Sequence, residues 1–155
     1  MDLPVKRLRP EARLPERAYP DDAAFDLYAA VDVLIAPLRR AVVPTGIALG
    51  LPPGVAALTL PRSGLAARHG ITIVNAPGLV DPGYRGDIQV ILLNTDPDEP
   101  FAVHIGDRIA QLLLVGLLDA VLVEVIELDR TIRGAQGFGS SGTAPLSGDG
   151  PQSDS

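Results

Sequence analysis

The chain has 155 residues, a length typical of one domain with a tail, and only 4% of them are aromatic, so its core must be built mainly from aliphatic residues. The absence of cysteine excludes disulfides, thiolate metal sites and a cysteine nucleophile, and it favours a cytoplasmic location. The net charge of −6 argues against nucleic-acid binding, which needs a basic face, but local arginines can still bind one small phosphorylated ligand.

Short apolar runs bounded by Gly and Pro follow one another along the chain. Most of these runs are rich in β-branched residues and end at turn signals, a pattern typical of an all-β sandwich or barrel. Strands are expected within residues 31–36, 46–51, 55–60, 71–74, 88–93, 109–114 and 121–126. Helical periodicity is weak almost everywhere, so we predict the all-β class.

Asp26 is an acid between Phe25 and Leu27, within an apolar segment that reads as a further strand. A buried acid needs a partner, because an unpaired charge is costly to remove from water. Asp26 is therefore either half of a structural ion pair or part of a site.

The segment PRSGLAARHG, residues 61–70, predicts one short helix. Ser63 can cap it, residues 64–69 can form about two turns, and Gly70 suits the left-handed exit position. The start of a helix attracts phosphate, and Arg62 would add a charge-assisted hydrogen bond there. An ordinary capped helix with a solvated arginine explains the same residues.

The segment NAPGLVDPGYRGD, residues 75–87, contains two Pro-Gly turn signals with Leu79 and Val80 between them. It predicts a tight hairpin whose exposed backbone could bind a planar ligand. Asp81 precedes a proline, which holds it in an extended conformation, and Tyr84 could lie against a sugar. Taken alone, the segment could equally be a loop in which Asp81 caps a turn.

Gln111 is a polar residue in the apolar strand that follows Asp107 and Arg108. It either pairs with the backbone or points into a site, because buried amides are hydrogen-bonded. The Asp–Arg pair itself reads as an ordinary surface turn. His69 and His104 have no further ligand at metal-binding spacing, so we predict no histidine metal site.

The most apolar stretch, residues 109–128, is long enough to suggest a membrane span. Asp119, Glu124 and Glu127 argue against it, since each acid at a membrane centre costs on the order of 2.5–3.5 kcal/mol. Gly116 and the Val-rich run favour two buried strands instead. The basic N-terminus has no apolar segment and is not a signal peptide, so no membrane association is expected.

From about Thr131 the composition shifts to Gly, Ser, Asp and Pro. Such a segment cannot bury enough apolar surface to fix its own conformation. We therefore predict a domain over residues 1–130 and a flexible C-terminal tail over residues 131–155. Phe138 is the only aromatic residue of that tail, and a disordered tail has no structural need for a phenyl ring.

Five stretches, read together and in order, resemble the five motifs of the homotrimeric dUTPase family. They are AAFDLYAA (23–30), PRSGLA (61–66), NAPGLVDPGYRGDIQV (75–90), GDRIAQL (106–112) and RGAQGFGSSG (133–142). The match is highly specific, because chance would have to supply five ordered motifs. It implies a jelly-roll-like β-sandwich with one short helix that assembles as a homotrimer.

The resemblance also implies the reaction: dUTP is hydrolysed to dUMP and pyrophosphate with Mg²⁺, which keeps uracil out of DNA and supplies dUMP for thymidylate synthesis. Asp81 would be the general base that activates water for attack at the α-phosphorus. Tyr84 would stack on the deoxyribose and leave no room for a 2′-hydroxyl. Asp26 would act near the metal through water, with the ion held mainly by the substrate phosphates.

The remaining site residues fall into three groups by the part of the substrate that the resemblance assigns to them. The uracil would be held by Asn75, Leu79, Val80 and Gln89, and the phosphates by Arg62, Ser63, Gly64 and Gln111. The tail would close over the substrate through Arg133, Phe138, Gly139, Ser140 and Ser141. One departure is Pro82 directly after the base, where Ala or Ser is also expected, and it should rigidify the hairpin.

Two alternatives remain. A dCTP deaminase-like enzyme would share the fold and much of the motif layout, but it needs a glutamate acid/base, and Glu99, Glu124 and Glu127 are not beside the hairpin in sequence. A catalytically idle nucleotide-binding regulator of the same fold is the other. The intact Asp81, Arg62 and tail favour an active enzyme.

Overall fold

The computed structural model describes residues 1–135 of the chain. The chain divides into two units, Met1–Asp119 and Ala120–Ser155, and every strand and helix assigned in the described residues lies in the first unit. Among the described residues, no helix has the length and apolar character needed to cross a membrane.

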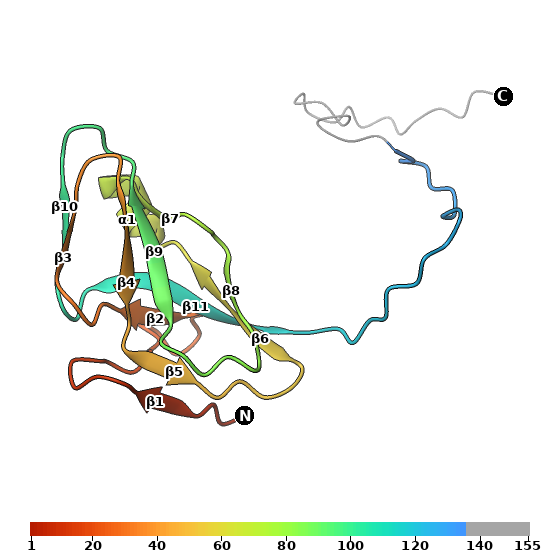
Figure 1. Cartoon of the computed structure of the whole chain (residues 1–155), viewed down its shortest axis with the longest axis horizontal. Coiled ribbons are helices and arrows are strands. Elements are labelled where there is room, and N and C mark those ends of the chain that lie inside the picture. Colours follow the sequence, from red (N-terminus) through yellow and green to blue (C-terminus); the bar gives the residue numbers. More distant parts are fainter. Residues whose placement is uncertain (136–155) are drawn as a thin grey trace. The chain divides into compact units, whose positions relative to one another are not determined.

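The first unit is built from short strands and one helix, which confirms the predicted all-β class (Figure 1). In chain order these are β1 (Val5–Arg7), β2 (Phe25–Tyr28), β3 (Val33–Ile35), β4 (Arg40–Pro44), β5 (Ile47–Leu49), β6 (Val55–Leu60), α1 (Ser63–His69), β7 (Ile71–Ile73), β8 (Gly78–Val80), β9 (Gln89–Asn94), β10 (Phe101–Val103) and β11 (Arg108–Gly116).

The strands pair antiparallel in four open sheets, and within the described residues they do not close into a barrel. The largest sheet has the order β2-β11-β6-β8, and the next has the order β4-β9-β7. Most neighbours are distant in sequence, as in β2 beside β11 (Figure 1), so the chain returns repeatedly from one sheet to another. This topology is that of the jelly-roll sandwich.

The core is aliphatic, as the composition predicts. Its largest fully buried side chains are Leu27, Ile35, Val43, Ile47, Leu49, Leu51, Ile71, Ile88, Val90, Leu92, Ile109 and Leu112. In β9 the burial alternates, with Val90, Leu92 and Asn94 inside, because successive strand residues point to opposite faces. The core thus fixes the inward face of β9, the strand that follows the segment predicted as a hairpin.

The helix confirms one prediction and corrects another. Gly70 ends it in the left-handed conformation, with φ 62°. Ser63 does not cap it: Arg62 occupies the capping position with extended backbone, and no side chain caps the helix. The Arg62 carbonyl instead accepts the first intrahelical bonds, from the Leu65 and Ala66 N–H groups at 3.1 and 3.0 Å, so Ser63 is the first helical residue.

The strand expected at residues 121–126 is absent, and that prediction is wrong. β11 ends at Gly116, and the following apolar residues are exposed, with Leu122 at 97% and Ile126 at 103% relative exposure. A strand needs a partner edge as well as suitable residues. Among the described residues no strand pairs with this segment.

Candidate active site

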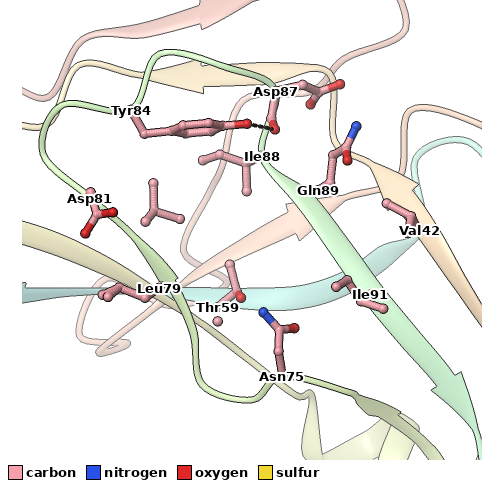
Figure 2. A pocket seen from close by; sticks show the side chains of 12 residues that line it. Val42, Thr59, Asn75, Leu79, Asp81, Tyr84, Asp87, Ile88, Gln89 and Ile91 are labelled. Carbon is pink, nitrogen blue, oxygen red and sulfur yellow. Dashed lines mark hydrogen bonds between the residues drawn. The ribbon is translucent and has the colours of Figure 1, made fainter.

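The segment predicted as a tight hairpin, residues 75–87, does not form one: β8 pairs with β6 and β9 pairs with β4 and β7, so the segment crosses from one sheet to another. It borders a cavity, which we call the hairpin cavity after that prediction (Figure 2). Its volume is about 320 Å³, within the range typical of small-molecule sites. The lining residues are Val42, Thr59, Asn75, Gly78, Leu79, Val80, Asp81, Tyr84, Asp87, Ile88, Gln89 and Ile91. They come from β4, β6, β8 and β9, from the loop between β7 and β8, which holds Asn75, and from the loop that joins β8 to β9.

Six predicted site residues meet in this cavity: Asn75, Leu79, Val80, Asp81, Tyr84 and Gln89. Sequence reasoning missed its apolar side, to which Val42 of β4 and Ile91 of β9 contribute. These two residues face each other in the β4–β9 register. Val42 is 54% exposed in the structure, and the available signal in the sequence was its place beside Val43, since neighbouring strand residues point to opposite faces.

Gly78 lets β8 approach β6 at the edge of the cavity. It pairs with Thr59 in the strand register, and a β-carbon on Gly78 would overlap the Thr59 hydroxyl. Only glycine therefore fits at this close approach without displacing Thr59. The contact positions the first residues of the hairpin against the sheet.

The loop between β8 and β9 is held by hydrogen bonds to its own backbone and to β5. Arg85 Nη1 donates to the carbonyls of Pro82 at 2.6 Å and Tyr84 at 2.8 Å, with the Leu49 carbonyl 3.5 Å away. Asp87 Oδ1 accepts the Gly46 N–H at 2.8 Å. These contacts fix the loop at its tip and at its exit.

Asp81 lies at the mouth of this loop and lines the cavity (Figure 2). Its backbone carbonyl accepts the Tyr84 N–H at 3.1 Å and so closes a tight turn. Its carboxylate is exposed and accepts no hydrogen bond from the described residues. The backbone of Asp81 thus closes the turn, while its carboxylate caps nothing among the described residues and stays open to a ligand or a water.

A second charged site lies where β2, β11 and the start of α1 meet. Asp26 Oδ2 accepts a hydrogen bond from Arg108 Nη1 at 3.0 Å, and Asp26 Oδ1 lies 3.2 Å from Arg62 Nε. Arg62 Nη1 also donates to the Arg108 carbonyl at 2.8 Å. The Asp26 side chain is 7% exposed, so its charge is compensated by two arginines. We call Asp26, Arg62 and Arg108 the ion cluster.

In this cluster, Asp26 Oδ1 can still accept a hydrogen bond. The Arg62 Nε contact is close enough for ionic attraction but is not aligned as a hydrogen bond, so this buried oxygen has no hydrogen-bond partner among the described residues. The described residues contain no group of three acidic, histidine or cysteine side chains that could hold a metal. A single orphaned carboxylate oxygen suits a metal-bound water rather than a metal held by the protein alone.

Ser63, Gly64 and Gln111 lie around the ion cluster. Ser63 and Gly64 open α1 next to Arg62, and a β-carbon on Gly64 would come 2.9 Å from Arg68 Nη2. Gln111 pairs in register with Asp26 on one side and Leu60 on the other. Sequence reasoning missed Arg108, although the need of a buried Asp26 for a cation was the signal.

The hairpin cavity and the ion cluster are separate within one chain. Arg62 and Arg108 border another cavity of about 260 Å³, which is completed by Leu65, Phe101, Val103, Asp107 and Ile109. This second cavity shares no lining residue with the hairpin cavity. The structure thus brings the predicted residues together in two groups rather than in one.

The predicted tail residues are the last group. Arg133 lies in the second unit. Phe138, Gly139, Ser140 and Ser141 lie outside the described residues, which end at Ala135. The domain boundary at residue 130 and the tail over residues 131–155 stay predictions.

An open carboxylate beside a cavity, together with an arginine-rich ion cluster, is the kind of site expected of a protein that acts on a phosphorylated ligand. A family model described as dUTPase matches residues 10–142. A deoxyuridine 5′-triphosphate nucleotidohydrolase of Thermobifida fusca is 58% identical over 138 residues, covering 89% of this chain and 77% of its own. The enzyme of that name from Corynebacterium glutamicum is 53% identical over 142 residues, covering 90% of this chain and 94% of its own.

Solved structures agree with these relatives. The Staphylococcus bacteriophage 80alpha dUTPase with dUPNHPP aligns with TM-score 0.84 and 30% identity, covering 91% of this chain and 98% of its own. A mutant dUTPase from phage phi11 of S. aureus, which coordinates a structural Mg(II) ion, aligns with TM-score 0.77 and 26% identity, covering 82% and 98%. The chain belongs to the dUTPase family. The predicted activity, dUTP hydrolysis, is confirmed at the level of the family.

One of the three glutamates considered for a deaminase lies in the first unit. Glu99 precedes β10 and does not line the hairpin cavity, whereas Glu124 and Glu127 lie in the second unit. Within the first unit, the cavity therefore has one acid whose carboxylate accepts no hydrogen bond, Asp81, because the Asp87 carboxylate accepts the Gly46 N–H.

Proposed function

We propose that this chain hydrolyses dUTP to dUMP and pyrophosphate, with Asp81 as the general base. The observation that carries the proposal is the open carboxylate of Asp81 at the mouth of the hairpin cavity. A carboxylate with no protein partner can accept a proton from a water, and general-base catalysis contributes roughly 10²–10⁴-fold. The activated water attacks the α-phosphorus, and the bond to the bridging oxygen breaks as pyrophosphate leaves.

The hairpin cavity is assigned to the nucleoside. Asn75, Leu79, Val80 and Gln89 surround a space that is large enough for a planar base. Tyr84 lies across the loop above Ile88, where its ring can stack on a deoxyribose (Figure 2). A ring in that position leaves no space for a 2′-hydroxyl, which supports discrimination against ribonucleotides.

The ion cluster is assigned to the phosphates. Arg62 and Arg108 together carry two positive charges against the single charge of Asp26, so the cluster retains a net positive charge for an anion. The neighbouring Ser63, Gly64 and Gln111 would add polar contacts, as the family resemblance implies. Phosphoryl transfer depends mainly on positioning and on neutralising charge, which arginines supply.

The cofactor proposed for the reaction is Mg²⁺, carried mainly by the substrate phosphates. Asp26 Oδ1 fits this ion, because it is a buried carboxylate oxygen with no hydrogen-bond partner and can accept one from a metal-bound water. When bound, the ion neutralises charge on the phosphates. The protein's own part is to hold Asp26 in place through Arg62 and Arg108.

A homotrimer would combine the two groups of residues that one chain keeps apart. The separation of the hairpin cavity from the ion cluster supports sites shared between subunits. The apolar residues after β11, with Leu118 at 94% and Leu122 at 97% exposure, give each chain a surface that a second copy would bury. Replacing Leu122 and Ile126 with Ser should shift a sizing measurement toward monomer, whereas Leu34→Ser on β3 should not.

The last motif, Arg133 and Phe138 to Ser141, is assigned by resemblance to closure over the bound nucleotide. Closure of this kind excludes bulk water from the reaction. Removing the chain after Leu128 should leave a folded protein with badly impaired turnover. Unchanged turnover would remove this role. The cysteine-free sequence fits the reducing cytoplasm as the compartment.

The test of the main proposal is a nucleotide panel assayed for pyrophosphate release, with parent and Asp81→Asn proteins side by side. The parent should release pyrophosphate from dUTP, and the variant should not. Ammonia release from dCTP would favour the deaminase. If parent and variant are both inactive while dUTP still binds, the idle nucleotide-binding module is the correct interpretation.

A further inference from the structure

The ring of Tyr84 lies on Gly86. The Tyr84 hydroxyl donates a hydrogen bond to the Asp87 carbonyl at 3.0 Å, and Figure 2 shows the ring edge-on, spanning the loop from its own backbone to Asp87. A β-carbon added to Gly86 would come 2.6 Å from Tyr84 Cζ, 3.0 Å from Cε2, and closer still to the hydroxyl oxygen. The three nearest atoms to such a carbon all belong to the tyrosine side chain.

Any side chain at position 86 would therefore displace the ring rather than the backbone. The backbone of Asp87 is held in place because its carboxylate accepts the Gly46 N–H at 2.8 Å. The Tyr84 side chain is the freer partner, since it is 47% exposed and rotates about two bonds. A displaced ring loses its hydrogen bond to the Asp87 carbonyl and leaves the position proposed for stacking on the sugar.

We infer that Gly86 is a specificity-determining residue: its missing side chain seats the Tyr84 ring against the loop, in the position that excludes a 2′-hydroxyl. This inference rests on the proposed role of Tyr84 at the sugar. Gly86 is a positioning residue, because it acts on the substrate only through the ring. It does not line the hairpin cavity.

The same loop offers a matched control. A β-carbon on Gly83 meets nothing within 4 Å, and neither Gly83 nor Gly86 has positive φ. Replacing either glycine with alanine thus restricts the unfolded chain equally without straining the folded backbone. Only the replacement at position 86 collides with Tyr84.

The experiment compares kcat/KM for dUTP and for UTP by pyrophosphate release in the full chain and in Gly83→Ala, Gly86→Ala, Tyr84→Ala and the double variant Tyr84→Ala/Gly86→Ala. Gly86→Ala should lower the dUTP-to-UTP ratio about tenfold, the scale of a single misplaced contact in a pocket. Gly83→Ala should keep the parent ratio. The double variant should match Tyr84→Ala alone, because residues that act through one group are not additive.

The outcomes separate this inference from the proposed function. If Tyr84→Ala leaves the ratio unchanged, the sugar role of Tyr84 fails and the inference fails with it. If Tyr84→Ala lowers the ratio and Gly86→Ala does not, only the positioning role assigned to Gly86 is overturned. If Gly86→Ala does not fold, recovery of folding in the double variant supports the ring collision. Failure of the double variant, when Tyr84→Ala itself folds, overturns the inference.

Discussion

The hairpin cavity and the ion cluster reach their ligand-binding geometry by opposite means. The cavity is built from backbone turns, apolar side chains and amides, and its one open charge is Asp81. The ion cluster is built from full charges, with Asp26 held between Arg62 and Arg108. We propose that the first arrangement binds a ligand by shape and hydrogen-bonding pattern and that the second binds by charge.

This difference explains why neither region alone resembles a complete active site. A base-reading pocket without cations cannot bind a triphosphate, and an arginine cluster without a shaped pocket cannot select one nucleoside. Within the ion cluster, Asp26 offsets one of the two positive charges of Arg62 and Arg108. Substitutions in the hairpin cavity and in the ion cluster should therefore change different measured properties of the protein.

The largest effect is expected from the open carboxylate of the hairpin. Asp81→Asn should lower kcat about 10²–10⁴-fold, because an amide cannot accept the proton of the attacking water. Binding of a non-hydrolysable dUTP analogue, measured by calorimetry, should be largely retained. Asp98→Asn, which changes an exposed acid in the turn before β10, is the control. Loss of analogue binding in the Asp81 variant would assign Asp81 to binding instead.

Removing a cation from the ion cluster should have the next largest effect. Arg62→Gln should lower kcat/KM for dUTP roughly 10²-fold, the usual cost of one charge-stabilising donor. Binding of deoxyuridine, which has no phosphate, should not change. Asn75→Ala in the hairpin cavity should weaken both ligands alike. If the Arg62 variant lost as much affinity for deoxyuridine as for dUTP, the proposed division of roles between the two regions would be wrong.

Removing the anion of the cluster should reduce stability. Asp26→Asn leaves two arginines without a counter-charge, and we expect a loss of about 1–3 kcal/mol, below that of a fully buried pair because Arg108 is half exposed. Urea denaturation measures it, with the exposed Asp21→Asn as control. A variant as stable as the parent would show that the cluster serves binding only.

A carboxylate held by backbone N–H groups alone provides the smallest and most localised effect. Asp96 Oδ1 accepts the Asp98 and Glu99 N–H groups at 2.9 Å, and these bonds, the one from Glu99 first, lower the pKa of Asp96 below its ordinary 3.8. Its stabilisation is therefore present above pH 3.8 and is lost as the pH falls through the lowered pKa. Asp96→Ala should be less stable than the parent at neutral pH, and the difference should shrink in acid; a constant difference would contradict the assignment.

Much of the fold could be predicted because its signals are local. The strand β6 has the bounds that its apolar run predicts, and Gly70 ends α1 in the left-handed conformation. The two Pro-Gly signals did mark a turn-rich loop, but the predicted hairpin was wrong, because the strands on either side of that loop, β8 and β9, pair in different sheets. The capping role of Ser63 was wrong, because the helix begins one residue earlier than expected and Arg62 occupies the capping position.

Strand pairing was less predictable than strand character. Residues 109–114 and 121–126 look alike in sequence, yet the first segment lies in β11 between β2 and β6 and the second has no partner among the described residues. Hydrophobicity and β-propensity act within a segment, whereas pairing needs a free edge supplied by distant residues. The composition does not indicate how many strand edges of the folded sheets are available for pairing.

The sequence by itself determined the all-β class and the family through its five motifs, and it is the source of the proposal that Asp81 is the base. Only the tertiary structure decided that Arg108 lies against Asp26 across 82 residues of chain, that the hairpin cavity and the ion cluster stay apart, and that Tyr84 rests on Gly86. The physical reason is the distance along the chain over which each kind of interaction acts. Turn chemistry and strand periodicity act over a few residues, while the partner of a charge and the room beside a ring depend on atoms that meet only when the sheets have assembled.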